Sequence, residues 1–179
     1  VPFGNDGDFS NIALVNRINS DLVNDLGNLC QRSLTMIERK LNSIVPDIKN
    51  NGDDEIVLQD STKIILNESI ELIEDFKIHD YIKLVWAHIG KVNKYFNDSR
   101  PWELEKDDKE MFMNVLAATV EQIKNIAFFI YPIMPNKSRE LLKIIGIENT
   151  NMTFDEMKRV NVFGNKLLKV SHLFSRVQE

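Results

Sequence analysis

Two short groups of residues in this chain could bind a nucleic acid. Asn24, Asn28 and Arg32 follow one another at four-residue intervals, and Pro101-Trp102 lies further along the chain. Side chains four residues apart lie above one another on one face of a helix. Asparagine amides both donate to and accept from a base edge, arginine offers a planar fork of donors, and an aromatic ring offers a stacking surface to unpaired bases. Together the two groups could hold a loop of single-stranded RNA.

Each group also has a structural explanation. A polar row on an amphipathic helix is most often a solvated face, although asparagine is a poor helix former and two at interior positions gain nothing from helix propensity. A tryptophan after a helix-ending proline more often fills a core than binds a base. The same explanation is stronger for Trp86, which lies within an expected helix. From the residues alone, a solvated face, a core side chain and an RNA site all remain open.

The composition of the chain is that of a globular protein. Its 179 residues fit one large domain or two small ones, and its apolar fraction of 43% and charged fraction of 27% are ordinary. The formal net charge of −5 argues against a general nucleic-acid coat, but not against a site with local arginines and lysines. The single cysteine, Cys30, cannot form an internal disulfide, which suits the reducing cytoplasm.

Neither a membrane span nor a secretory leader is expected. The longest apolar run, 126–134, contains Pro132 and falls short of the roughly 18 apolar residues that a span requires. The first residues have no basic region followed by an apolar one, and they do not begin with methionine. We therefore expect a fragment, in which case any catalytic apparatus lies upstream.

Helical periodicity predicts an all-α bundle of about five main helices. The first is expected from near Ser10 to about Leu41, with apolar residues at helical spacing: Val15, Ile18, Leu22, Leu26, Leu29 and Met36. At about 100° per residue, the row of Asn24, Asn28 and Arg32 falls on the flank away from this stripe, together with Arg17 and Arg39. This flank should be exposed and locally basic.

The remaining elements follow from breaks and caps. Pro46 and 50–54 form the clearest break, a second helix covers about 61–76, and a third runs from about 80 to 97 and ends before Pro101. Asp107, with Glu110 three residues on, predicts the start of a fourth helix that reaches 129 or 130 and is buried nearly all round. A fifth runs from Pro135 to a cap at Gly146, a short helical piece covers 154–158, and 164–179 should be partly helical and pack back on the body.

Motifs for catalysis or for metal binding are absent from the sequence. It contains no paired-cysteine metal motif, no glycine-rich phosphate loop and no nucleophile elbow. His79, His88 and His172 are scattered, and none has a second histidine at metal-ligand spacing. Acidic pairs lie on polar faces and are expected to be solvated. We therefore expect no catalytic residue and no metal site in this chain.

One tetrapeptide, His88-Ile89-Gly90-Lys91, needs separate treatment. It resembles the His-Ile-Gly-His signature with which class I aminoacyl-tRNA synthetases hold ATP. That signature opens a helix after the first strand of a nucleotide-binding sheet. Here the tetrapeptide lies inside an expected amphipathic helix, ends in lysine, and has no expected strand before it. We interpret it as a coincidence.

Longer segments resemble the bacterial methionyl-tRNA synthetase family. The run NRINSDLVNDLGNLCQR at 16–32 is very similar to the first anticodon-domain helix of that family, and VNKYFNDSRPWEL at 92–104 is similar to its Asn-x-Tyr … Lys/Arg-Pro-Trp-x-Leu segment. FGNDGDFS at 3–10 resembles the piece that follows the family's Lys-Met-Ser-Lys-Ser region. LFSRV at 173–177 resembles its Leu-Phe-Pro-Arg-Ile terminus, with Ser175 in place of proline. Residues 43–78 add little to the resemblance.

The resemblance implies an anticodon-binding bundle of the class I synthetase type. It implies a connector at 1–10, the bundle at 11–145, and a C-terminal segment at 146–179 that packs back on the body. By motif position, Asn24, Asn28 and Arg32 would contact the bases of a CAU anticodon. Trp102 would stack on the cytosine, and Pro101 would shape that platform.

The implied function is selection of methionine and initiator tRNAs for a methionine–tRNA ligase. Candidates for phosphate contacts are Arg17, Arg39, Lys91, Lys94 and Arg100. The catalytic domain of the same polypeptide would bind ATP and magnesium, while this segment would need no cofactor, would be inactive alone and would be a cytoplasmic monomer. Two alternatives stay open. One is a helical protein–protein interaction module, and the other is the bundle of another class I synthetase, such as those for isoleucine, leucine, valine or cysteine.

Overall fold

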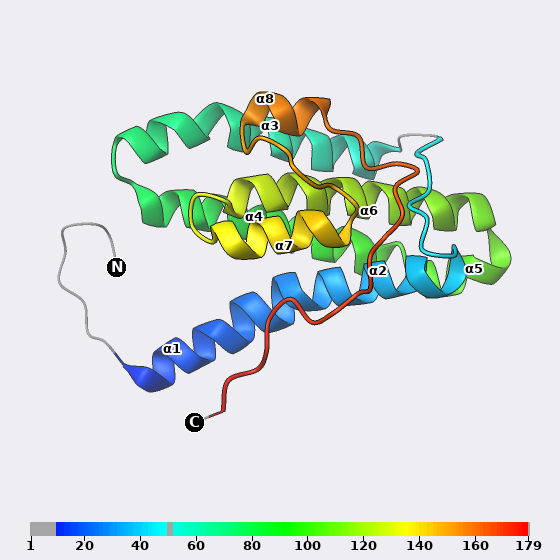
Figure 1. Ribbon diagram of the computed structural model, residues 1–179, viewed down its shortest axis with the longest axis horizontal. Helices are drawn as coiled ribbons and strands as arrows, with labels where there is room; N and C mark the ends of the chain where they lie inside the picture. The colour runs from blue at the N-terminus through cyan, green and yellow to red at the C-terminus, as the bar shows by residue number, and fades with distance from the viewer. Residues whose placement is uncertain (1–9, 50–51, 179) are drawn as a thin grey trace.

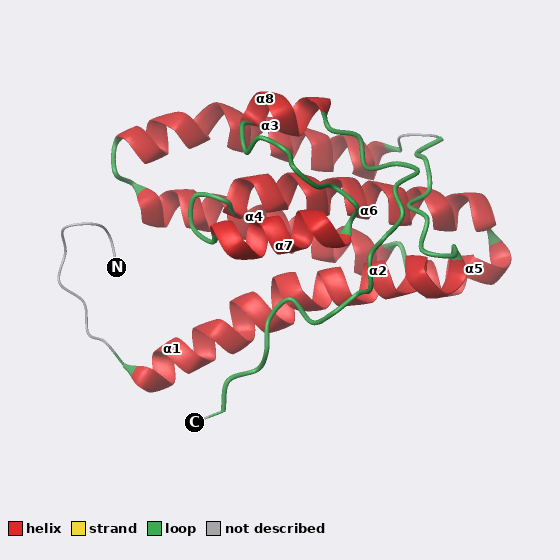
Figure 2. Cartoon of the chain, viewed as in Figure 1, coloured by secondary structure: helices red, strands yellow, loops and turns green. Residues whose placement is uncertain are grey.

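The computed structural model describes residues 10–49 and 52–178, and in this part of the chain every regular element is a helix (Figure 2). The only extended pairing within these residues is an isolated bridge between Ile44 and Lys166. The prediction of an all-α bundle is therefore confirmed. The connector expected at 1–10 lies, except for Ser10, outside the described residues.

One long helix runs along an edge of the bundle (Figure 1). It consists of α1 (Asn11–Arg17), a π-helical stretch η1 (Ile18–Gly27) and α2 (Asn28–Lys40), which follow one another without a break. Ser10 caps its start, because its hydroxyl oxygen accepts the backbone N–H of Ala13 at 3.3 Å. The predicted helix from near Ser10 to about Leu41 is confirmed in its extent.

The π-helical stretch changes the phase of this helix. In a π-helix each backbone N–H bonds five residues back, as the N–H of Asn28 does to the carbonyl of Val23. Each turn therefore contains more residues than an α-turn, and the 100° spacing used for the sequence does not hold between 18 and 27. Asn24 lies inside η1, whereas Asn28 and Arg32 lie on α2. The three side chains follow the same helix but do not form a straight α-helical row.

An antiparallel pair of helices, α3 (Asp53–Glu74) and α4 (Ile78–Asp98), covers one side of the bundle (Figure 1). The predicted start near residue 61 is wrong, because α3 begins at Asp53 and residues 53–54 are helical. The carboxylate of Glu55 accepts the backbone N–H of Gly52 at 2.8 Å, and the acidic first turn suits the positive end of a helix dipole. The predicted start and end of α4 differ from the structure by one or two residues.

A short helix, α5 (Pro101–Asp107), separates α4 from the central helix α6 (Lys109–Ile130). The predicted cap at Asp107 is wrong, because α5 continues through that residue. The cap of α6 is Asp108, whose carboxylate accepts the N–H of Met111 at 2.9 Å. The end of α6 and its burial nearly all round are confirmed, since most of its residues are inaccessible to solvent.

The remaining helices agree with prediction. Helix α7 (Pro135–Ile144) packs on α6, and Gly146 follows it with a φ of +76°, a left-handed conformation that glycine adopts without strain. Helix α8 (Phe154–Arg159) matches the short helical piece expected at 154–158.

The segment after α8 is not helical up to residue 178, so the helix expected within 164–179 is wrong. Its backbone groups bond instead to other segments: the N–H of Leu167 donates to the carbonyl of Ser43 at 2.7 Å, and the N–H of Leu168 to that of Ile144 at 2.9 Å. From there the segment crosses the long edge helix (Figure 1). Among the described residues, no helix is long and apolar enough to cross a membrane.

Candidate nucleic-acid interface

The guanidinium group of Arg32 lies between two aromatic rings and an amide. Its central carbon is 5.2 Å from the ring centre of Phe96 and 5.2 Å from that of Trp102. Its Nη1 donates to Oδ1 of Asn97 at 2.8 Å. The two rings meet edge to face, with centres 6.3 Å apart. Arginine stacked on aromatic faces and held by a hydrogen bond is a pre-organised cluster, which we call the Arg32 stack: Arg32, Phe96, Asn97 and Trp102.

The turn between α4 and α5 places Trp102 in this stack. Arg100 takes a left-handed conformation with φ of 44°, and Pro101 is buried at the first position of α5, where its fixed φ suits a helix start. A salt bridge of 2.8 Å between Lys40 and Glu105 ties α5 to the end of α2. Trp102 nevertheless remains 43% exposed, so it is not a core side chain. It is an aromatic surface supported from one side.

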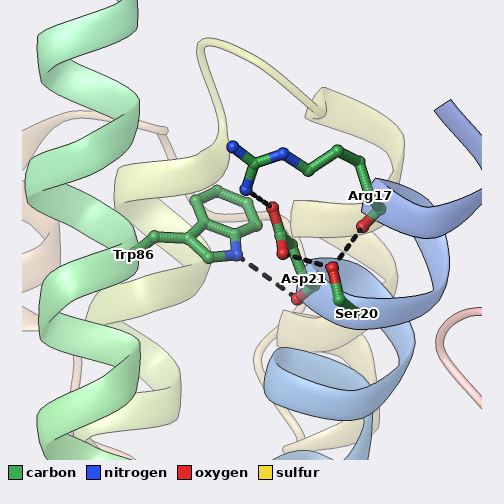
Figure 3. A network of polar contacts seen from close by, with 4 residues as sticks. All are labelled: Arg17, Ser20, Asp21 and Trp86. Atoms are coloured by element: carbon green, nitrogen blue, oxygen red, sulfur yellow. Dashed lines mark hydrogen bonds and ion pairs between the residues drawn. The ribbon is translucent and has the colours of Figure 1, made fainter. Parts of the chain in front are cut away.

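Trp86, by contrast, has the structural role expected of it. It packs against the core, and its indole N–H donates to the backbone carbonyl of Asp21 at 3.3 Å, which fastens α4 to η1 (Figure 3). The amide of Asn93 does the same further along α4, donating to the carbonyl of Asp25 at 3.3 Å. With Asn97, these side chains define the side of α4 that faces the long edge helix.

Asn24 and Asn28 are exposed beside a hollow under the C-terminal segment. This cleft has a volume of about 370 Å³ and is lined on one side by η1 and α2 and on the other by 172–174. Its lining residues are Val23, Asn24, Gly27, Asn28, Gln31, His172, Leu173 and Phe174. Oδ1 of Asn24 accepts a hydrogen bond from Nη2 of Arg176 at 3.0 Å. The cleft thus has amide groups along one wall and an aromatic ring on the other.

Gln31 adds a buried polar group to this wall. Its Nε2 donates to the hydroxyl of Thr35 at 3.2 Å, while its Oε1 is buried and has no hydrogen-bond partner among the described residues. An unmatched buried acceptor costs about 1–3 kcal/mol. In η1, burial and then the neighbouring charge of Asp21 raise the pKa of the Asp25 carboxyl.

The basic residues proposed for phosphate contacts are dispersed. Arg17 is exposed and pairs with Asp21 at 2.7 Å, and the Ser20 hydroxyl donates to the same carboxylate (Figure 3). Lys94 pairs with Asp98 on α4, and Arg39 is exposed in the last turn of α2. Exposed ion pairs such as these contribute little to stability.

Two more of these basic side chains lie elsewhere on α4 and α5. The Nζ of Lys91 donates to the hydroxyl of Ser61 on α3 at 3.2 Å, so Lys91 faces α3 and not the long edge helix. Arg100 is exposed at the turn before α5, 3.6 Å from the carboxylate of Glu103. The structure therefore brings Arg100 near the Arg32 stack and directs Lys91 away from it.

The tetrapeptide at 88–91 lies in the middle of α4. His88 is buried, with its ring nitrogens 3.1 Å from the Ser61 hydroxyl and 3.1 Å from Oε1 of Gln122. Burial lowers the pKa of His88 to about 4, so the ring is neutral at pH 7. Its role is to satisfy polar groups inside the bundle. Among the described residues, no group of three or more His, Cys, Asp or Glu side chains could hold a metal ion.

Sequence reasoning did not single out three residues of this surface. Phe96 and Asn97 lie in the same segment, 92–104, as Pro101-Trp102. The sequence motif includes them but does not indicate their contacts with Arg32. Arg176 meets Asn24 from 152 positions away, and a lone arginine near a chain end carries no local signal of that contact. Only the folded chain brings them together.

Known proteins match this chain closely. A family model described as the anticodon binding domain of methionyl tRNA ligase matches residues 45–179. The methionine–tRNA ligase of Fusobacterium nucleatum is 32% identical over 98% of the chain, and that of Mycobacterium tuberculosis is 35% identical over 82%; in both cases 29% of the relative is covered.

The fold is also shared with solved structures. The free form of Mycobacterium tuberculosis methionyl-tRNA synthetase superposes with a TM-score of 0.96 at 32% identity, over 100% of this chain and 37% of that one. The complex of the same synthetase with methionyl-adenylate gives a TM-score of 0.93 and covers 98% of this chain. The chain therefore spans about a third of the length of the proteins it resembles.

Proposed function

The chain belongs to the methionyl-tRNA ligase family, as its anticodon-binding domain, and we propose that it binds the CAU anticodon loop of methionine and initiator tRNAs. The observation that carries this proposal is the Arg32 stack. An exposed indole that is held in place by a cation and a second ring is suited to stack on an unpaired base. We assign the cytosine of the anticodon to Trp102, on the platform that Pro101 shapes.

In this proposal the asparagines contribute sequence discrimination. Asn24, Asn28 and Arg32 offer donors and acceptors to the edges of bases that have left the stack. Such recognition suits an RNA loop, because the major groove of an RNA helix is too narrow for side chains to read. The exposure of Asn24 and Asn28 beside the cleft supports this assignment.

Phosphate contacts would position the loop without specifying its sequence. We propose Arg17, Arg39, Lys94 and Arg100 for this role, and we omit Lys91 because its ammonium group faces α3. The slope of log K against log salt is negative, and replacing any one of these four side chains by alanine should reduce its magnitude by about 0.7, the value per contact for single strands.

The proposed role in the whole ligase is substrate selection. Anticodon binding here would choose the tRNA, while aminoacylation with ATP and magnesium would take place in the catalytic part of the longer polypeptide. We divide the chain into a connector at 1–10, the bundle at 11–145 and a C-terminal segment at 146–179. Since translation takes place in the cytoplasm, we assign that compartment, and we propose a monomer.

The test of this proposal is aminoacylation by the full-length ligase that contains this chain. Trp102→Ala should lower kcat/KM for the CAU tRNA by about tenfold or more, since one stacked base contributes about 1–3 kcal/mol. Asn28→Ala should lower it by about tenfold, the loss expected for one hydrogen bond to a base edge. Phe76→Ala is the matched control, because Phe76 is an exposed aromatic residue in the turn between α3 and α4, at the opposite end of the bundle from α5 (Figure 1). Unchanged kcat/KM in both test variants would contradict the anticodon assignment.

The same proteins separate the alternatives. For an interaction module without an RNA role, changing an anticodon base would leave the binding of the stem-loop unchanged. The bundle of another class I synthetase would prefer a different anticodon. A titration with stem-loops that differ from CAU in one base therefore distinguishes the three functions.

A further inference from the structure

The amide of Asn24 is held in one orientation by Arg176. A guanidinium group only donates hydrogen bonds, so the Asn24 atom 3.0 Å from Nη2 of Arg176 must be the amide oxygen. The amide nitrogen of Asn24 consequently points the other way, and it makes no hydrogen bond within the described part of the chain. Asn28 has no such side-chain partner among the described residues, so its amide is free to turn.

The segment that carries Arg176 is itself fixed to the long edge helix. The amide of Asn19 in η1 forms two hydrogen bonds with the backbone of Val177, one to its carbonyl and one from its N–H, both 2.9 Å long. Leu173 is buried in the core, and the Phe174 ring lies 5.7 Å from the ammonium group of Lys137 on α7. Arg176 therefore lies between residues of the same segment that are anchored to the helices on both sides of it.

Gly27 of the long edge helix lies against this segment. A Cβ built at Gly27 would lie 3.5 Å from the Phe174 ring and 2.9 Å from the carbonyl oxygen of Leu22. The cleft of about 370 Å³ is what remains between 172–174 and the amides of Asn24, Asn28 and Gln31. The C-terminal segment thus forms the second wall of the surface that carries the asparagines.

We infer that Arg176 is a positioning residue for anticodon reading: it fixes the Asn24 amide so that the NH2 group is the one offered to a base in the cleft. This inference rests on the proposed function. It predicts that the base read by Asn24 presents an acceptor, such as a carbonyl oxygen or an unprotonated ring nitrogen, and that a base presenting a donor at that place is rejected.

The test compares Arg176→Ala, Asn24→Ala and the double variant in the full-length ligase, by titration with a fluorescent CAU anticodon stem-loop. Asn24→Ala should bind about tenfold more weakly, the loss expected for one hydrogen bond to a well-oriented group. Arg176→Ala should bind more weakly than the wild type but lose no more than Asn24→Ala does, because it removes only the orientation of that amide. Because Arg176 acts through Asn24, the double variant should match Asn24→Ala within about twofold. Arg176→Lys should recover part of the affinity, since an ammonium group is also only a donor. Arg159→Ala, an exposed arginine of α8, is the control.

Stem-loops changed at one anticodon base then separate positioning from a merely structural effect. In Arg176→Ala, the penalty for the base change that replaces an acceptor with a donor should shrink, because the Asn24 amide can then turn. If Arg176→Ala merely loosened the C-terminal segment, it would lower the affinity for all stem-loops equally. If Arg176 contacted a phosphate instead, the losses of affinity in Arg176→Ala and Asn24→Ala would multiply in the double variant, and the magnitude of the salt slope would fall by about 0.7. Either result would overturn the inference, as would unchanged binding in Arg176→Ala. If the wild-type ligase fails to distinguish CAU from the changed loops, it is the proposed function that fails instead.

Discussion

At the scale of single residues, the surface depends on side chains that are held before any ligand arrives. Arg32 is fixed by Asn97 and by the rings of Phe96 and Trp102, and Asn24 is fixed by Arg176. A side chain that is already ordered loses less conformational entropy on binding than a free one. The half-exposed Trp102 and the oriented amide of Asn24 are therefore better suited to recognition than exposed residues of the same types would be.

His88 makes the stability of the bundle depend on pH. Its pKa is about 4 in the folded chain, against 6.5 for a free histidine. Between these two pH values His88 is therefore protonated in the unfolded chain and neutral in the folded chain. The contribution of His88 to the free energy of unfolding is fully present above pH 6.5, and this free energy should fall by about 3 kcal/mol as the pH drops to about 4. Urea unfolding at pH 7 and at pH 4.5 measures this loss.

His88→Gln is the control for this prediction, because it keeps polar contacts toward Ser61 and Gln122 but cannot titrate. Carboxylates protonate in both proteins and contribute equally to the change. The variant should lose clearly less stability than the wild type over the same pH interval. An equal loss in the two proteins would show that His88 does not cause the pH dependence.

At the scale of elements, the π-helical stretch η1 is the feature that shapes the surface. It positions Asn19 and Asn24 for their contacts with Val177 and Arg176. Long π-helical stretches are rare, and π-turns occur frequently at functional sites. At its end, Gly27 leaves room for the Leu22 carbonyl, which a side chain would displace.

Two glycines within helices should therefore respond in opposite ways to substitution by alanine. At Gly27 the new Cβ would lie 2.9 Å from the Leu22 carbonyl oxygen, so the helix backbone must shift and Gly27→Ala should destabilise the fold. At Gly90, in α4, nothing lies within 4 Å of a new Cβ, so Gly90→Ala should stabilise it by about 0.5–1 kcal/mol. Chemical denaturation of both variants tests the pair. A Gly27→Ala protein as stable as Gly90→Ala would mean that η1 tolerates a side chain there.

At the scale of the whole molecule, the proposed RNA surface lies on one edge and at one end. The long edge helix forms this edge, α5 closes its end, and the C-terminal segment crosses it (Figure 1). The central helix α6 contacts α2, α3, α4, α7 and α8, and so holds these parts in one body. The chain covers 29% of the Fusobacterium nucleatum ligase and 37% of the Mycobacterium tuberculosis synthetase.

The isolated chain should consequently bind RNA without catalysing amino-acid activation. We expect the 179-residue protein to bind a CAU stem-loop and to show no methionine-dependent ATP–pyrophosphate exchange. The full-length ligase, assayed in parallel, should show exchange. Exchange activity in the isolated chain at a rate near that of the full ligase would contradict a purely tRNA-selecting role.

The amino-acid sequence by itself predicted what depends on local order along the chain. The end of the fourth predicted helix at 129 or 130 and its burial nearly all round, the start of α7 at Pro135 and the cap at Gly146 each follow from a few neighbouring residues, and the structure confirms them. The resemblance of 16–32 and 92–104 to one family indicated the family correctly. These features need only propensities, patterns or matching motifs.

Tertiary structure decided everything that depends on distant partners. Whether Trp102 lies in the core or at the surface is settled by Arg32 and Phe96, and the orientation of Asn24 is set by Arg176. The non-helical course of the last residues is accompanied by backbone hydrogen bonds to distant segments, and Asn19 in η1 bonds to Val177, 158 positions away. Local preferences amount to fractions of a kcal/mol per residue, so packing and hydrogen bonds between distant segments override them.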